Sequence, residues 1–461
     1  MTRPFLTEEE CRVPPTHPKP DESVAVWPPP QQQRQQQNRM FTRAKFSRFE
    51  LLPPVLCTRR VYVQVAFLLL IGLVIFLVRM MSAMRGTFVH YHLESDTDGE
   101  LVILPTEFAQ KRGAVCLDGS PPAYYYRQSV VPAVRFWIIH LQSGGWCTTA
   151  EECLERSESA LGSSLKTEMS MPLEGVMSSD CTTNPDFCLW HMVDLLYCDG
   201  GSYLGNRSEP LEVNSKKVYM RGALVFDALI EYLATFTLFK DAEQIIFAGS
   251  SAGSLGALIH ADRLRERLPS SVKTVHLLVD GGLFVDVPDI NGDHSMANIL
   301  RDAFSFHHLH NFVGMKECTR TVTEEEEEYR CVLPEVFHKY VFTPIFFINS
   351  LYDTWFRKNA LKIDCTLDLC SDINLREVVN TRIKILNEGQ EILRSKKNGV
   401  FFTSCPCHTV LMKKKFFSIT SRRVTVQQAL GAWIDHQGNR RNLTEVLEVT
   451  DALRTCPSLI L

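Results

Sequence analysis

A short serine motif framed by glycines is the clearest sign of chemistry in this chain of 461 residues. Gly-Ser-Ser-Ala-Gly at residues 249–253 follows an apolar run, QIIFA at 244–248, and precedes a stretch with helical spacing of apolar residues, 254–268. GxSxG between a strand and a helix is typical of a nucleophile elbow, where small neighbours let a tight turn present the serine hydroxyl. Ser251 is the predicted nucleophile, and Ser250 is the rival serine.

A serine nucleophile needs a histidine as general base and a carboxylate that orients the histidine. Asp353 and His408 follow Ser251 in the chain order Ser-Asp-His that this type of elbow requires. Each lies a few residues beyond a predicted strand. Asp280, which ends another predicted strand, is the rival acid, and His260, two helical turns past the nucleophile, is a weaker rival base.

The chemistry also needs backbone N–H groups that stabilise the tetrahedral oxyanion. The residue after the nucleophile, Ala252, supplies one. The others are expected from a glycine-rich loop that follows an early strand, and residues 143–147 (SGGWC) after the strand at 136–141 form such a loop. Gly145 and Trp146 are therefore the predicted donors.

No metal, cofactor or nucleic-acid partner is expected. His307, His308 and His310 have no carboxylate at useful spacing and are interpreted as polar loop residues, and no CxxC pair recurs at zinc-ligand spacing. The composition is globular, with 45% hydrophobic and 22% charged residues. A net charge of −4 without a basic domain argues against nucleic-acid binding.

From about residue 100 onward, apolar runs of strand length alternate with helical stretches. Predicted strands cover residues 136–141, 193–197, 244–248, 274–279, 344–349 and 399–403, and predicted helices cover 220–234, 254–268 and 373–396. This alternation predicts an α/β fold with a mostly parallel sheet and helices on both faces. Ligands of such sheets lie off the carboxyl ends of the strands, where the candidate residues fall.

The first 81 residues have a different composition. Residues 1–60 hold a proline cluster and a glutamine tract, which predict a disordered tail. Residues 61–81 are apolar enough to span a bilayer, and they begin too late for a cleaved signal peptide. Basic residues before this segment and acidic residues after it predict a cytoplasmic tail and a type II signal-anchor. Residues 82–461 would then form one catalytic domain in the secretory lumen (Golgi or elsewhere) or outside the cell.

Thirteen of the fifteen cysteines follow the predicted anchor, as expected for an oxidising compartment. Closely spaced cysteines are predicted to form disulfides: Cys147/Cys153, Cys181/Cys188, Cys365/Cys370 and Cys405/Cys407. Because thirteen is odd, at least one thiol must remain outside the intrachain disulfides. The sequons at Asn206 and Asn442 lie on the same side of the anchor and are predicted glycosylation sites.

Taken together, the motifs resemble the pectinacetylesterase/Notum family of α/β-hydrolase-like carboxylesterases. The resemblance runs from about residue 117 to about residue 433. It includes WIIHLQSGGWC at 137–147, NPD at 184–186, YCDGGS at 197–202, GSSAG at 249–253, DGGLF at 280–284, TPIF at 343–346, YD at 352–353 and CPCH at 405–408. The resemblance implies Ser251, Asp353 and His408 as the triad, and Gly145, Trp146 and Ala252 as the oxyanion hole.

By this resemblance the chain is expected to be a carboxylic ester hydrolase. The family acts on acetyl esters of cell-wall polysaccharide or on the palmitoleate ester of Wnt proteins. YCDGGS is more similar to the first branch, so deacetylation of a polysaccharide is expected. A Notum-like deacylase of an acylated protein and a catalytically silent, membrane-tethered binding protein are the alternatives. Gln142, Ser143 and Ser254 depart from the family pattern beside the oxyanion hole and bear on rate and acyl-pocket shape.

Overall fold

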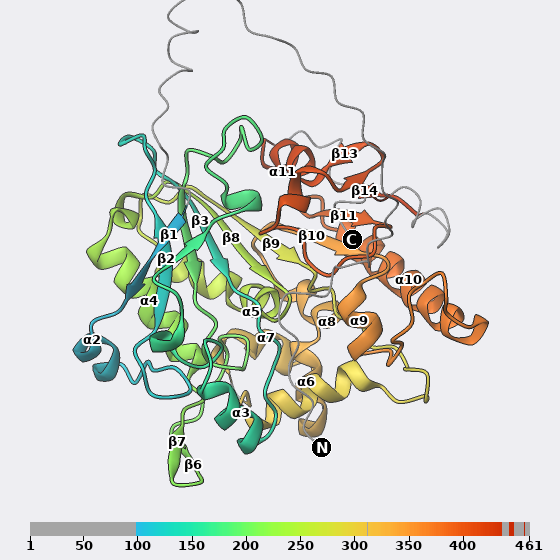
Figure 1. Ribbon diagram of the computed structural model, residues 1–461, viewed down its shortest axis with the longest axis horizontal. Coiled ribbons are helices and arrows are strands. Elements are labelled where there is room, and N and C mark those ends of the chain that lie inside the picture. Colours follow the sequence, from blue (N-terminus) through green and yellow to red (C-terminus); the bar gives the residue numbers. More distant parts are fainter. Residues whose placement is uncertain (1–97, 311, 436–441, 447–455, 457–461) are drawn as a thin grey trace, which may run out of the picture. The chain divides into compact units, whose positions relative to one another are not determined.

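The computed structural model describes residues 98–310, 312–435, 442–446 and 456, which centre on one large sheet (Figure 1). The sheet has ten strands in the order β14-β11-β10-β9-β8-β3-β5-β2-β1-β4. In chain order these are β1 (Asp98–Ile103), β2 (Ala123–Arg127), β3 (Phe136–Leu141), β4 (Ser170–Pro172), β5 (His191–Leu195), β8 (Gln244–Ser250), β9 (Thr274–Asp280), β10 (Ile345–Ser350), β11 (Gly399–Thr403) and β14 (Asn442–Thr444).

The strands from β14 to β5 in this order all run parallel, whereas β2, β1 and β4 continue the sheet as an antiparallel edge. The prediction of a mostly parallel sheet is confirmed for the described residues. The antiparallel edge was not predicted, because its strands are short and lack a long apolar run. Two small hairpins complete the strands: β6 (Leu211–Val213) with β7 (Lys216–Val218), and β12 (Thr420–Ser421) with β13 (Val424–Thr425).

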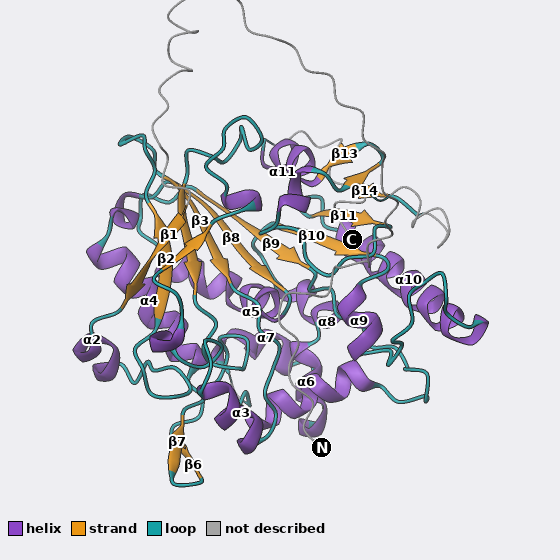
Figure 2. Ribbon diagram, in the orientation of Figure 1, coloured by secondary structure: helices purple, strands orange, loops and turns teal. Residues whose placement is uncertain are grey.

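Helices follow most of the parallel strands (Figure 2). The α-helices are α2 (Thr106–Lys111), α3 (Ala150–Ser157), α4 (Gly222–Phe236), α5 (Ala252–Arg267), α6 (Ser295–Phe306), α7 (Lys316–Thr319), α8 (Pro334–Phe337), α9 (Thr354–Asn359), α10 (Asp372–Leu393) and α11 (Val426–Ile434). Short 3₁₀ turns join several of them. The predicted helices at 220–234, 254–268 and 373–396 correspond to α4, α5 and α10.

Side chains that alternate along the central parallel strands build the two largest hydrophobic cores of the described residues. On β3, Ile139 joins the core that also contains residues of α4, α5, α6 and α10, whereas Ile138 joins the core with α11. On β10, Phe347 and Phe346 divide in the same way. Successive side chains of a strand point to opposite faces, so a central strand that is apolar at every position must be covered on both sides. Helices on both faces are thus confirmed, with most of them on one face.

Two predicted boundaries differ from the structure near the site. The strand predicted at 193–197 is β5, which ends at Leu195, because Tyr197 leaves the sheet and donates a hydrogen bond from its hydroxyl to the Gly145 carbonyl oxygen at 2.5 Å. The helix predicted from residue 254 begins at Ala252, directly after the predicted nucleophile. The turn between strand and helix is therefore tighter than the apolar spacing alone indicated.

Six disulfides stabilise the domain. They are Cys116–Cys198, Cys147–Cys153, Cys181–Cys188, Cys318–Cys331, Cys365–Cys370 and Cys405–Cys456. Three of the four predicted pairs are confirmed. The prediction of Cys405/Cys407 is wrong, since Cys405 pairs with Cys456 and Cys407 is buried outside the six disulfides. A disulfide needs its two Cβ atoms about 3.8 Å apart. On extended backbone, the Cβ atoms of residues i and i+2 point the same way but are roughly 6.6 Å apart, which is too far for a disulfide.

The predicted tail at 1–60, the predicted anchor at 61–81 and the first residues of the predicted domain lie outside the described residues. Within the described part of the chain, no helix combines the length and the apolar character needed to span a bilayer. Both sequon asparagines, Asn206 and Asn442, are exposed. Their glycosylation stays a prediction.

Candidate active site

Ser251 occupies the turn between β8 and α5 in a backbone conformation that is rare for a residue with a side chain. Its φ is 53° and its ψ is −123°. A Cβ atom on Gly249 would lie 2.3 Å from the Gly253 carbonyl oxygen, and one on Gly253 would lie 2.3 Å from the carbonyl oxygens of Leu141 and Gln142. Glycine is therefore required on both sides of the turn, and the strained serine is the geometry expected of a nucleophile elbow.

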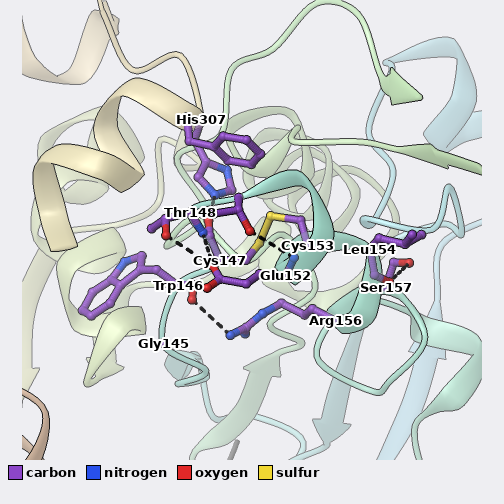
Figure 3. Close-up of a disulfide and its surroundings, with 12 residues drawn as sticks. Gly145, Trp146, Cys147, Thr148, Glu152, Cys153, Leu154, Arg156, Ser157 and His307 are labelled. Atoms are coloured by element: carbon purple, nitrogen blue, oxygen red, sulfur yellow. Dashed lines mark hydrogen bonds between the residues drawn. A yellow bond between two sulfur atoms is a disulfide. The ribbon is translucent and has the colours of Figure 1, made fainter. Parts of the chain in front are cut away.

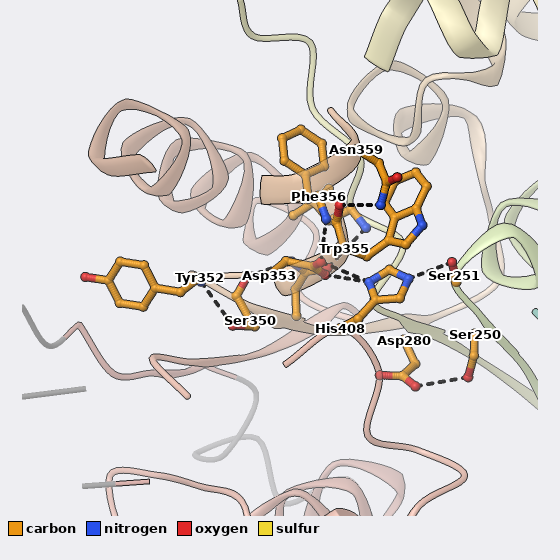
Figure 4. Close-up of polar contacts among 12 residues, drawn as sticks. Ser250, Ser251, Asp280, Ser350, Tyr352, Asp353, Trp355, Phe356, Asn359 and His408 are labelled. Carbon is orange, nitrogen blue, oxygen red and sulfur yellow. Dashed lines mark hydrogen bonds and ion pairs between the residues drawn. The ribbon is translucent and has the colours of Figure 1, made fainter. Parts of the chain in front are cut away.

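The structure brings Ser251, His408 and Asp353 together at the carboxyl ends of three parallel strands (Figure 4). The Nε2 atom of His408 lies 2.7 Å from the Oγ atom of Ser251. On the other side of the ring, Nδ1 lies 2.8 Å from Oδ2 and 3.0 Å from Oδ1 of Asp353. Because a carboxylate can only accept here, Nδ1 carries the proton, and Nε2 is left to accept the serine proton.

The carboxylate of Asp353 is held by the helix that follows it. Asp353 is the N-cap of α9, and its Oδ1 accepts a hydrogen bond from the Phe356 amide at 2.9 Å. The side chain of Asp353 is 6% exposed, whereas that of His408 is 19% exposed. The ring of Trp355 stacks on His408, with centroids 5.5 Å apart. A buried carboxylate thus fixes the orientation of an imidazole that remains partly exposed to solvent.

The glycine loop after β3 is held in place by hydrogen bonds to its carbonyl oxygens. Arg156 of α3 donates to the Gly144 carbonyl at 2.6 Å, and the Tyr197 hydroxyl donates to the Gly145 carbonyl at 2.5 Å. The indole N–H of Trp146 donates to the Ser202 hydroxyl at 2.8 Å. Gly145 has a φ of +65°, a conformation that favours glycine. Because each carbonyl lies in one planar peptide unit with the N–H of the next residue, the donors that fix the carbonyls also orient the amides of the loop.

The backbone N–H groups of Gly145, Trp146 and Ala252 make no hydrogen bond to a protein acceptor within the described part of the chain. The Ala252 amide opens α5, so it has no partner inside the helix. Ala252 is fully buried and Trp146 nearly so. Gly145 is partly buried. Buried amides without acceptors are rare, and three amides without acceptors near Ser251, two of them in buried residues, can stabilise an anion.

Cys147 and Cys153 tie the end of the glycine loop to α3 (Figure 3). His307 lies close to both sulfur atoms, and its Nε2 makes a hydrogen bond of 2.9 Å to the Cys147 carbonyl. The two sulfurs are bonded to each other and cannot act as thiolate ligands of a metal ion. Burial lowers the pKa of His307 to about 4, so its imidazole is neutral and serves as a structural donor.

Neither rival residue hydrogen-bonds to Ser251 Oγ or to the ring of His408 within the described part of the chain. His260 is fully buried in α5, bonds to the Tyr203 carbonyl and stacks on Phe226, and burial lowers its pKa well below the usual value. Asp280 lies next to the site, and its main-chain carbonyl accepts a hydrogen bond from the Ser251 amide at 2.8 Å. Its carboxylate accepts hydrogen bonds from the Val410 amide and from the Ser250 hydroxyl.

Two residues of the region were missed by the sequence reasoning. His140 on β3 and Asp194 on β5 are buried behind the site, and Nδ1 of His140 donates to Asp194 at 2.6 Å. A polar residue at one position of an otherwise apolar strand was the available signal, in FWIIHL and in HMVDL. Buried polar groups need partners, so each of these two residues could be expected to have one, but the sequence did not indicate which residue it was.

The chain matches the family model described as pectinacetylesterase over residues 94–456. It is 34% identical to pectin acetylesterase 5 of Arabidopsis thaliana over 70% of this chain and 78% of that protein. It is 25% identical to the human palmitoleoyl-protein carboxylesterase NOTUM over 69% of this chain and 63% of that protein. A crystal structure of the Wnt deacylase Notum from Drosophila is similar in fold, with a TM-score of 0.64 and 21% identity, over 76% of this chain and 97% of that chain.

The family match covers most of the chain, and the similarity to Notum identifies the sheet as that of an α/β-hydrolase. Both sets of relatives are carboxylic ester hydrolases by name. The chain therefore belongs to the pectinacetylesterase family and is a carboxylic ester hydrolase.

Proposed function

We propose that this protein removes acetyl groups from an O-acetylated polysaccharide, with Ser251 as the nucleophile. The observation that carries the proposal is the 2.7 Å contact between Ser251 Oγ and His408 Nε2, with Asp353 on the opposite ring nitrogen. His408 takes the serine proton as Oγ attacks the acetyl carbonyl, and it returns the proton to the leaving sugar oxygen. Water then hydrolyses the acyl-enzyme by the reverse use of the same base.

The tetrahedral intermediates place a negative charge on the former carbonyl oxygen. The amides of Gly145, Trp146 and Ala252 are proposed to bind this oxygen, which would give each of them the acceptor that the protein does not provide. The N-terminus of α5 adds a favourable electrostatic field at the same point. Gly253 packs against the Leu141 and Gln142 carbonyls, which keeps the helix end and the glycine loop adjacent.

The acetyl group is favoured over a long acyl chain for two reasons. First, identity is 34% to pectin acetylesterase 5 of Arabidopsis thaliana but 26% to the palmitoleoyl-protein carboxylesterase NOTUM of Schmidtea mediterranea. Second, the rings of Trp146, Phe284 and Trp355 pack against one another beside His408, with centroids 5.5, 6.1 and 5.9 Å apart. The mostly apolar pocket on which Trp146 borders has room for about one water, so it does not offer space for a long acyl chain next to this ring cluster.

The cellular setting is part of the proposal. Six disulfides and two exposed sequon asparagines support a domain that folds in an oxidising compartment. We propose that residues 61–81 anchor this domain in the membrane as a type II protein, with the acylated polysaccharide on the lumenal or outer side.

Hydrolysis of p-nitrophenyl acetate and p-nitrophenyl octanoate tests the proposal. A burst of nitrophenolate equal to the enzyme concentration, followed by a higher kcat/KM for the acetate, is expected. A higher kcat/KM for the octanoate would favour the deacylation of an acylated protein instead. The absence of both a burst and steady turnover with either ester would indicate a silent binding protein and contradict the proposal.

A further inference from the structure

A second set of buried polar residues lies directly behind the site. Nδ1 of His140 donates to Asp194 at 2.6 Å, and its Nε2 lies 3.0 Å from the Ser250 hydroxyl oxygen. Ser250 donates in turn to Oδ2 of Asp280 at 3.0 Å (Figure 4). All four side chains are at least 95% buried. The contacts join the carboxyl ends of the neighbouring strands β5, β3, β8 and β9.

The Asp280 carboxylate continues this set into the loop that carries His408. It accepts hydrogen bonds from the Val410 amide at 3.1 Å and from the Leu411 amide at 3.0 Å. The main-chain carbonyl of the same aspartate accepts from the Ser251 amide at 2.8 Å. One residue therefore contacts the backbone of the nucleophile, the neighbour of the nucleophile and the backbone two and three residues beyond His408.

The next residue confirms how closely the two segments approach. A Cβ atom on Gly281, whose φ is +59°, would lie 2.4 Å from the carbonyl oxygen of His408. Only glycine fits here, so the His408 loop packs on the end of β9 without a side chain between them. The position of His408 relative to Ser251 thus depends on contacts with residues 280 and 281.

The Ser250 hydroxyl lies between two possible acceptors of its single proton. Ser250 has one hydroxyl proton but faces both Nε2 of His140 and the Asp280 carboxylate. Both contacts are hydrogen bonds only if one further proton resides on His140 or on Asp280.

We propose that Asp280 is a positioning residue for the reaction: its carboxylate clamps the His408 loop to the strand that ends at the nucleophile, and Ser250, His140 and Asp194 hold that carboxylate in place. The inference rests on the proposed role of His408 as the general base. The oxyanion donors and the Asp353 contact are independent of it.

The test counts reactive sites and measures their reactivity separately. Diethyl p-nitrophenyl phosphate releases one nitrophenolate per phosphorylated serine, so the amplitude gives the number of active sites and the rate constant gives their reactivity. In Asp280→Asn the full amplitude is expected with a rate constant lower by about 10²-fold, because a displacement of the base by about 1 Å costs that much. With p-nitrophenyl acetate, kcat should fall in parallel while KM changes little.

Asp262→Asn is the matched control. The Asp262 carboxylate likewise accepts hydrogen bonds from two backbone amides, those of Phe342 and Thr343, and from the Thr343 hydroxyl. These contacts lie just before β10, at the amino ends of the parallel strands and so at the end of the sheet opposite to the site. This variant should lose stability and keep the rate constant per active site. A rate constant for Asp280→Asn within twofold of the parent would overturn the inference.

Ser250→Ala keeps the test decisive if Asp280→Asn does not fold. This variant removes the hydroxyl from the carboxylate but leaves the two amides, so a reduction of about three- to tenfold per active site is expected. A rate equal to that of the parent would overturn the inference. A parent protein that is itself not phosphorylated would overturn the proposed function as well, which distinguishes the two failures.

Discussion

Two adjacent serines each end a chain of hydrogen bonds through a histidine to an aspartate. Ser251 contacts His408 at 2.7 Å and His408 contacts Asp353 at 2.8 Å. Ser250 contacts His140 at 3.0 Å, and His140 contacts Asp194 at 2.6 Å. By residue type and distance alone, the Ser251–His408–Asp353 series and the Ser250–His140–Asp194 series of hydrogen bonds are hard to tell apart. They are called the accessible chain and the buried chain below.

Backbone geometry and access separate the two chains. Ser251 lies on the strained turn before α5, whereas Ser250 is the last residue of β8 and donates a hydrogen bond to Asp280. The side chain of His408 is 19% exposed, and that of His140 is 3% exposed. A reactive triad therefore needs a base that substrate can reach, a serine proton with no other acceptor and amides free for the oxyanion. The buried chain has none of these features, and its proposed role is to hold the Asp280 carboxylate in place.

The sharpest contrast is expected from the two serines. Ser251→Ala should lower kcat by about 10⁶-fold, because the nucleophile is lost. Ser250→Ala should lower kcat by no more than about tenfold, since only a support is lost. Initial rates with p-nitrophenyl acetate, per mole of folded protein, measure both. A larger loss in Ser250→Ala than in Ser251→Ala would reverse the assignment of the two chains.

Substitution of Asp353 should lower mainly the activity, whereas substitution of Asp194 should lower mainly the stability. Asp353→Asn leaves the wrong ring tautomer on His408 and should lower kcat by about 10⁴-fold with little change in melting temperature. Asp194→Asn breaks a buried pair with His140 and should lower the free energy of unfolding by about 3–5 kcal/mol, with a much smaller effect on the rate per active site. Chemical denaturation measures the stability of both variants, and active-site titration with initial rates measures their activity per active site. Similar stability losses in the two variants would contradict this contrast.

The loop that supplies the amides should show a smaller effect. Tyr197→Phe removes the hydroxyl that donates to the Gly145 carbonyl and accepts from the Ser202 amide, and kcat should fall about tenfold as the donors lose their alignment. Tyr125→Phe is the control, because this tyrosine is also buried but its hydroxyl donates to the Glu168 carbonyl, beside the antiparallel strands of the sheet. Equal kcat values for the two variants would argue against a role of the loop in binding the oxyanion.

The smallest expected effect concerns pH. Burial raises the pKa of Asp280 above its usual value, so the folded protein binds more protons than the unfolded chain between the two pKa values. The contribution of this group to stability is therefore greatest at low pH and decreases as pH rises through the folded pKa. The melting temperature of the parent relative to Asp280→Asn should accordingly decrease from pH 4 to pH 8. An increase over this range would contradict the raised pKa.

The accessible chain could be predicted from the sequence because its signals are local. Ser251 lies in a five-residue motif, and Asp353 and His408 each follow an apolar strand at the edge where parallel strands end. The buried chain could not be predicted, since the pairing of His140 with Asp194 depends on which strands are neighbours in the sheet. The Cys405–Cys456 disulfide joins residues 51 apart and was beyond local spacing for the same reason.

The most direct test of the assignment is to locate the covalent label of a fluorophosphonate. Tryptic peptide 241–263 contains both Ser250 and Ser251, so fragmentation between the two residues identifies the modified one. The label is expected on Ser251 of the parent and absent from Ser251→Ala, with labelling of Ser250→Ala retained. A label on Ser250, or labelling that persists in Ser251→Ala, would contradict the account.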